Sequence, residues 1–148
     1  MANSVRTYNP ARVAVIVNGY SITGFTDGEY VNVAMISDGI TTQVGADGEI
    51  ARAINTDRRC TVTITLQQTS PANDYLSRLY DVDALTCGGH AGPILIQDLC
   101  GTTIFQASSS WVTKPADMGF SNEISERAWT LQTGAPSIHN VGSNVATG

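Results

Sequence analysis

The most informative shortage in this sequence is a shortage of positive charge. Only 14% of its 148 residues are charged, and 8 Lys or Arg stand against 13 Asp or Glu, which gives a formal net charge of −5. There is a single lysine, Lys114. Binding to nucleic-acid phosphates or to an anionic membrane surface requires clustered cations. The composition therefore argues against both kinds of partner.

Long apolar runs are also missing. The longest aliphatic run, Val13 to Val17, is far shorter than the roughly 20 residues of a membrane span, and no apolar core of a secretory signal precedes it. We therefore expect folding in the cytoplasm. The three cysteines, Cys60, Cys87 and Cys100, are odd in number and lack paired spacing, which favours small buried thiols. A disulfide between subunits stays open as an alternative.

Residues that would indicate catalysis or metal binding are scarce. His90 and His139 have no Ser, Cys or carboxylate at a catalytic spacing. Cys87 and His90 would supply only two of the four ligands that a structural zinc site needs. The closest acid pairs are two or three residues apart, a spacing typical of solvated faces. We therefore predict a protein that is not an enzyme and that uses no metal or cofactor.

The sequence is rich in β-branched residues, with 17 Thr, 12 Val and 12 Ile. These residue types fit a pleated, half-buried surface, and the length is that of one domain. A first hairpin is predicted where Val13–Val17 is followed by Asn18-Gly19 and then by residues 20–25. The large rings of Phe105, Trp111, Phe120 and Trp129 are expected in the core or in a subunit interface.

A second strand pair is predicted from Val31–Met35, which stops at Asp38-Gly39, and from Ile50–Ile54 as its partner. The polar, Thr-rich segment between them is too long for a tight turn. We interpret residues 38–49 as a projecting hairpin arm.

The clearest strand is 60–66, in which Cys60, Val62, Ile64 and Leu66 share one face and three threonines share the other. The period then changes to that of a helix, with Ser70 as the predicted N-cap and Pro71 at the first helical position. Further strands are expected at 94–99, at 102–107 and at about 123–133. Residues 134–148 form an uncharged tail that is expected to be frayed.

One stretch goes beyond these patterns. Residues 49–57 and the strand 60–66 lead into Gln67-Gln68-Thr69-Ser70-Pro71-Ala72-Asn73-Asp74, and this arrangement resembles the tail tube proteins of contractile-tailed bacteriophages. Further matching segments are 120–123, 127–129 and the closing Val141-Gly142-Ser143-Asn144, which departs from the double glycine of the family. The resemblance covers most of residues 11–144.

The resemblance implies a mainly β fold, in which two packed antiparallel sheets form a barrel or sandwich with one flanking α-helix. It also implies a structural virion protein whose hexameric rings stack into a hollow tube that conducts phage DNA. The implied partners are further copies of the chain and the sheath, tape measure, tail terminator and baseplate proteins, with DNA passing without specific binding. The net acidic charge suits such a conduit, because a basic lumen would retain phosphates.

Two sets of contact residues follow as expectations. The ring-to-ring contacts are assigned to the arm and the tail: Thr41, Thr42, Gln43, Val44, Ile138 and Val141. The acids expected to face the lumen lie in or beside predicted strands: Glu49, Asp57, Asp98 and Glu126. The threonine face of strand 60–66 is expected to meet either the lumen or a polar subunit contact. The alternative function is a small β-barrel module that binds a ligand in its interior.

Overall fold

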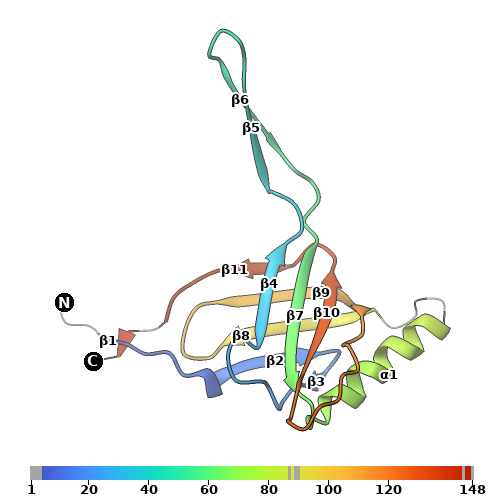
Figure 1. The fold of residues 1–148 in the computed structure, drawn as a ribbon. Helices are drawn as coiled ribbons and strands as arrows, with labels where there is room; N and C mark the ends of the chain where they lie inside the picture. The colour runs from blue at the N-terminus through green and yellow to red at the C-terminus, as the bar shows by residue number, and fades with distance from the viewer. Residues whose placement is uncertain (1–4, 87, 89–90, 145, 148) are drawn as a thin grey trace.

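The computed structural model describes residues 5–86, 88, 91–144 and 146–147. The body consists of β-strands with one helix at its side, and a long hairpin stands away from it (Figure 1). Three short elements lie near the termini: β1 (Val5–Arg6), the 3₁₀ turn η1 (Pro10–Arg12) and β12 (Ala146–Thr147). None of the helices in these residues has the length and apolar character needed to cross a membrane.

The main sheet is antiparallel and has the strand order β3-β2-β8-β9-β10-β7-β4, with β11 paired to β9. Figure 1 shows β4 and β7 crossing in front of β2, β8 and β9, so the bent sheet forms two packed layers. The predicted mainly β class with one flanking helix is confirmed, and the sheet does not close into a barrel. The strands of the main sheet are β2 (Val13–Val17), β3 (Tyr20–Ser21), β4 (Val31–Met35), β7 (Cys60–Gln67), β8 (Gly92–Asp98), β9 (Ile104–Lys114), β10 (Glu126–Thr133) and β11 (Ile138–Asn140).

The core lies between these two layers. The four alternating residues of β7, from Cys60 to Leu66, are completely buried, as the sequence predicts. Each fully buried aliphatic side chain stabilises the fold by about 1.5–3 kcal/mol. The other strands contribute their inner faces to the same cluster: Val15, Val17, Ile94, Ile96, Phe105, Ala107, Val112, Trp129 and Leu131.

The first hairpin is confirmed, with β2 paired to a shorter β3. Asn18 and Gly19 both have positive φ, 50° and 83°, as a two-residue turn between twisted strands requires. The sequence prediction also placed strands close to β8, β9 and β10. Strand β9 runs on to Lys114, well beyond the predicted end at residue 107, and β10 begins at Glu126 rather than at about 123.

The predicted partner of Val31–Met35 was wrong. Strand β4 pairs with β7, from Val31 opposite Ile64 to Met35 opposite Cys60, because Val31 and Val33 extend the apolar inner face of β7. Residues Ile50–Ile54 instead form β6, which pairs with β5 (Ile40–Val44) as a separate two-stranded sheet. This β5–β6 hairpin projects from the body beyond the paired ends of β4 and β7 (Figure 1). We call it the arm.

Helix α1 (Ala72–Leu85) packs on the core through Ala72 and Leu76. Pro71 has helical dihedral angles, φ −66° and ψ −17°, so Ser70 is the residue that precedes the first helical position. Its Oγ accepts a hydrogen bond from the Ala72 N–H at 3.2 Å and donates one to the Thr23 carbonyl at 2.5 Å. Ser70 therefore ties the helix start to the segment that follows β3.

The C-terminal tail is not frayed over its described part, which corrects that expectation. Strand β11 pairs with β9, and three hydrogen bonds join Thr102 to Ser143: the Thr102 amide and hydroxyl donate to the Ser143 carbonyl, and the Ser143 amide donates to the Thr102 hydroxyl. A side chain at Gly142 would collide with Thr102, so the close approach of the two segments requires glycine there. The tail gains order because it extends the antiparallel sheet of its own subunit.

The Ser70 geometry leads to a stability prediction. Replacing Ser70 with alanine removes the cap of α1 and leaves the Thr23 carbonyl without this donor, so the free energy of unfolding should fall by about 1–2 kcal/mol. Urea unfolding followed by circular dichroism measures the change. Ser77→Ala, at an exposed position of the same helix, is the matched control and should leave stability nearly unchanged. An equal effect of the two variants would contradict the capping role.

Candidate functional site

The arm exposes one apolar face. In its register Ile40 lies opposite Ile54 and Val44 lies opposite Ile50, so these four side chains share a face around the central Arg52. They are 54–76% exposed, and every residue from Ile40 to Ile54 is exposed. An isolated two-stranded hairpin is marginally stable in water. No other part of the described subunit covers this apolar arm face.

The predicted ring-contact residues lie on two different elements. Thr41, Thr42, Gln43 and Val44 belong to β5 and are all exposed. Ile138 begins β11, where it is 40% exposed, and Val141 follows that strand and is 83% exposed. Their contact role stays a prediction.

An ion pair within one chain segment lies at the base of the arm. The Arg59 guanidinium donates two hydrogen bonds to the Asp57 carboxylate, both 2.9 Å long, and Ser37 Oγ donates a third. These hydrogen bonds, led by those from Arg59, lower the pKa of Asp57 from 3.8 to about 2. Asp57 therefore holds the returning chain in place where the arm meets Cys60 at the start of β7.

The four acids predicted to face a lumen are dispersed over the subunit. Glu49 lies at the arm tip and Asp57 at the arm base, whereas Glu126 starts β10 opposite Gln67 at the other end of β7. Asp98 ends β8, where its carboxylate accepts hydrogen bonds from Asn144 and from the Cys100 amide. The structure does not bring these four side chains together.

The outward face of the sheet is polar and neutral where β7 lies between β4 and β10. Thr61, Thr63 and Thr65 are half-buried on this face, and Thr63 lies between Asn32 and Thr130 in the ladder. Gln132 lies beside Thr61, and Glu126 continues the same face of β10 at its edge. We call this surface the threonine face.

Sequence reasoning missed a surface in the irregular segment 115–125, which joins β9 to β10. Met118, Phe120 and Ile124 are 71–83% exposed, so Phe120 lies outside the core. Hydrogen bonds nevertheless hold the segment in place: Ser125 donates to Gln68 Oε1, and Arg127 donates to the Asp117 carbonyl. We call residues 115–125 the apolar loop. Its only sequence signal is three large apolar residues without strand or helix periodicity.

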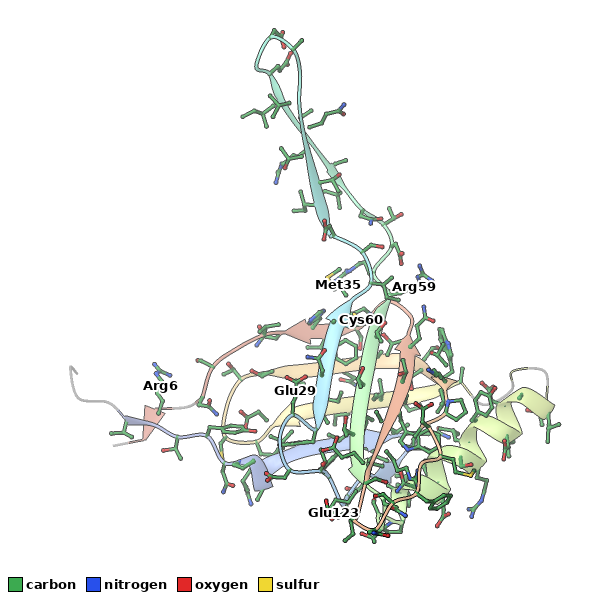
Figure 2. All side chains as sticks on the ribbon, in the orientation of Figure 1. Arg6, Glu29, Met35, Arg59, Cys60 and Glu123 are labelled. Atoms are coloured by element: carbon green, nitrogen blue, oxygen red, sulfur yellow. The ribbon has the colours of Figure 1, made fainter. Side chains whose placement is uncertain are left out.

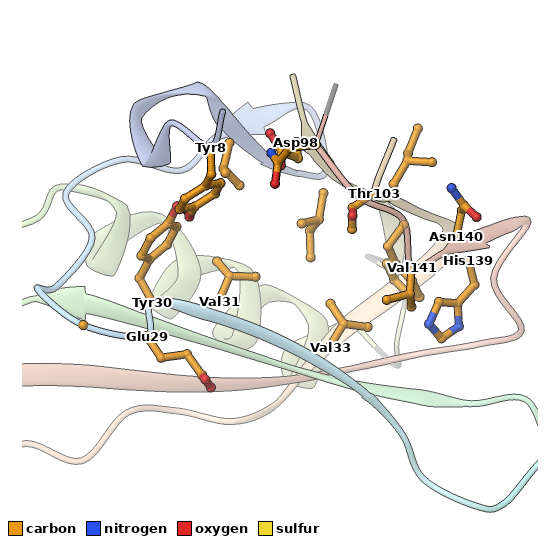
Figure 3. A pocket seen from close by; sticks show the side chains of 16 residues that line it. Tyr8, Glu29, Tyr30, Val31, Val33, Asp98, Thr103, His139, Asn140 and Val141 are labelled. Atoms are coloured by element: carbon orange, nitrogen blue, oxygen red, sulfur yellow. The ribbon is translucent and has the colours of Figure 1, made fainter. Parts of the chain in front are cut away.

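A cavity of about 480 Å³ lies between β4 on one side and β8, β9 and β11 on the other. Figure 3 shows Tyr8 and Tyr30 facing each other at one end of it, with Val31 and Val33 along one wall. The two hydroxyls are 3.3 Å apart, and Tyr30 also donates to the Pro10 carbonyl at 3.1 Å. Burial, followed by the hydrogen bond to Tyr8, raises the pKa of Tyr30 to about 12. These polar groups thus join the N-terminal segment to the start of β4.

The cysteine, histidine and acidic side chains of the described residues are dispersed. The described residues contain no group of three or more His, Cys, Asp or Glu side chains that would hold a metal ion. Cys60 is a buried free thiol, as predicted, and burial raises its pKa, while Cys100 is half-buried. Cys87 and His90, weighed above as zinc ligands, lie outside the described residues. His139 packs edge-on against Phe105.

Comparisons with known proteins agree with this description. A protein family described as "Bacteriophage PhiTE tail tube protein" matches residues 9–139. "Structural protein ORF10" of Pseudomonas phage KPP10 is 30% identical over 139 residues, which cover 88% of this chain and 80% of that protein. A solved structure of the anti-feeding prophage cap, a tube terminating cap, superposes with a TM-score of 0.57 at 13% identity, covering 95% of this chain and 97% of the other. This last likeness shows a shared fold.

The Tyr8–Tyr30 contact predicts alkaline destabilisation. Because the pKa of folded Tyr30 is about 12 and its ordinary value is 10.0, its contribution to stability is complete below pH 10 and is lost as the pH rises through 12. The urea midpoint of the native chain should therefore fall across this range, and that of Tyr30→Phe should fall less. Tyr80→Phe, which changes a helix residue, should follow the native chain. Identical profiles for all three proteins would rule out the Tyr30 contribution.

Proposed function

Since the chain belongs to the bacteriophage PhiTE tail tube protein family and is a structural phage tail protein, we propose that its copies form hexameric rings that stack into a hollow tube for DNA. The observation that carries this proposal is the apolar arm face. Its four aliphatic side chains are exposed on a hairpin of about 17 Å, which is five residues per strand at about 3.4 Å each. Such an arm reaches beyond its own subunit.

Ring formation would also cover the open edges of the main sheet. Strands β3 and β4 are the two edges of the main sheet, and the chain has only one lysine to discourage pairing at such edges. A closed ring removes exposed edges and prevents uncontrolled association. The remaining partners follow from the tail role: sheath, tape measure, tail terminator and baseplate proteins are proposed to contact the tube, which is assembled in the host cytoplasm.

We assign the threonine face to the lumen. On β4, β7 and β10 it carries neutral hydroxyl and amide groups, with Glu126 at one edge and the exposed Lys114 of β9 opposite Thr130, so it offers DNA phosphates few cations to bind. Of the four predicted lumen acids, Glu126 lies on this face, and the lumen role of Glu49, Asp57 and Asp98 stays a prediction. Net negative charge over the subunit adds weak repulsion of phosphates.

The arm provides the first test of the proposal. Replacing Thr41–Ala53 with an Asn-Gly turn keeps the Ile40–Ile54 pair and leaves the core untouched, so the melting temperature should stay within about 2 °C. Tube formation, observed by negative-stain electron microscopy, should be lost. Tubes of native length from this variant would contradict the assembly role of the arm.

A matched pair of variants separates the apolar arm face from the arm as a whole. Ile50→Ser with Ile54→Ser changes the apolar face, whereas Ala51→Ser with Ala53→Ser adds the same hydroxyls on the opposite face. The first variant should form tubes poorly, and the second should form tubes like the native chain.

The lumen assignment gives a second test, in phage particles. Thr63→Lys places a cation on the threonine face in every subunit and should slow DNA ejection several-fold, more strongly at low salt. Thr63→Gln is the neutral control at the same position. Tubes should assemble normally in both cases, because the side chain points away from the core. Equal ejection rates for the two variants would place this face elsewhere in the assembly.

A further inference from the structure

Two exposed apolar surfaces have no covering partner within the described subunit. The first is the apolar arm face, and the second is the apolar loop with Met118, Phe120 and Ile124. The ladder of β5 and β6 sets the shape of the arm, and hydrogen bonds to Gln68 and from Arg127 set the shape of the loop. Exposed surfaces that are apolar at their centre are typical of interaction sites.

The two surfaces lie at opposite ends of one strand. The arm returns to the body at Cys60, where β7 begins, and the apolar loop leads into Glu126, which is paired with Gln67 at the end of β7. Figure 2 shows Met35 and Arg59 at the base of the arm and Glu123 at the far end of the body. The eight residues of β7 separate the two ends by about 26 Å, at about 3.3 Å per residue.

The charges of the two surfaces are complementary. Arg52 stands at the centre of the apolar arm face, where its cross-strand neighbour is the neutral Thr42. Asp117 and Glu123 are exposed on the apolar loop among its large side chains. Two cations flank the loop: Lys114 directly precedes it and is exposed, whereas Arg127 is turned to the Asp117 carbonyl and lies 5.4 Å from the centre of the Phe120 ring. Arg52, which is surrounded by aliphatic side chains, is therefore complementary in charge to Asp117 and Glu123, which lie among apolar side chains.

The two acids at the arm tip fit this arrangement as well. Asp47 and Glu49 lie in the turn beyond the last pair of the ladder, so they extend past the aliphatic side chains of the apolar arm face. They are therefore not interposed between Arg52 and a partner surface that covers Ile40, Val44, Ile50 and Ile54.

We propose that the apolar arm face of one subunit docks on the apolar loop of a second copy in the next ring, with Arg52 paired to Asp117 and Glu123. This inference rests on the proposed tube function and names the receiving surface. The contact joins two different patches at opposite ends of the subunit, so it is head-to-tail and leaves one free patch at each end of a stack. The tube consequently has two unlike ends, one with free arms and one with free loops.

The decisive experiment is charge reversal. Arg52→Glu should reduce tube yield at least about tenfold, and the double variant Asp117→Lys with Glu123→Lys should do the same. The triple variant carrying all three changes should recover most of the native yield. Melting temperatures of the subunits show whether each variant remains folded. Arg78→Glu and Asp81→Lys, both exposed on α1, are the matched controls and should assemble like the native chain.

The outcomes separate the two proposals. If the native chain forms neither rings nor tubes, the proposed function is wrong. If the native chain forms tubes and the loop variant also does, or if the triple variant does not recover, the arm docks on another surface and the present inference fails. A closed two-subunit particle in place of a stack would equally contradict the head-to-tail contact.

A capping experiment remains informative even if the loop variant does not fold. Arg52→Glu subunits keep an intact apolar loop, so they should add to the arm-bearing end of preformed native tubes and then stop growth there. Gold labelling of a tag on the variant should therefore mark one end of each tube. Label at both ends, or none at either end, would overturn the proposal.

Discussion

The subunit is organised by an apolar surface that it does not cover by itself. Within the described residues, the arm face of Ile40, Val44, Ile50 and Ile54 packs against no core, and a two-stranded hairpin of this size has little stability of its own. We therefore propose that a contact with another molecule stabilises its conformation. The base of the arm continues into the β4–β7 ladder of the body, and the hydrogen bond from Ser37 to Asp57 joins the two chain segments there.

Strand β7 links the features on which the assembly proposal rests. Its inner face forms the centre of the core, its outer face carries the threonines, its start receives the arm, and its end lies beside the apolar loop. A change in the register of this strand would displace all four features together. The helix and Ser70 stabilise the chain directly after β7, so a single well-packed strand fixes the distance between the two ends of the subunit.

The sequence predicted those parts in which local pattern and burial agree. The alternation of Cys60–Leu66, the Asn18-Gly19 turn and the start of the helix each follow from short-range physical preferences. The partner of Ile50–Ile54 was predicted wrongly because alternation shows which residues share a face but not whether their own subunit buries that face. The apolar loop was missed for a related reason: Met118, Phe120 and Ile124 have no period, and their exposure is visible only in three dimensions.

The measurement that tests the account most directly is hydrogen exchange of the arm amides in free subunits and in assembled tubes. A hairpin completed by a neighbour should exchange rapidly in the free subunit and should be protected at least about a hundredfold more in the tube, while β7 stays protected in both. Equal and strong protection of residues 40–54 in the free subunit would show that the arm is stable alone. That result would contradict the dependence on a second molecule from which the assembly argument starts.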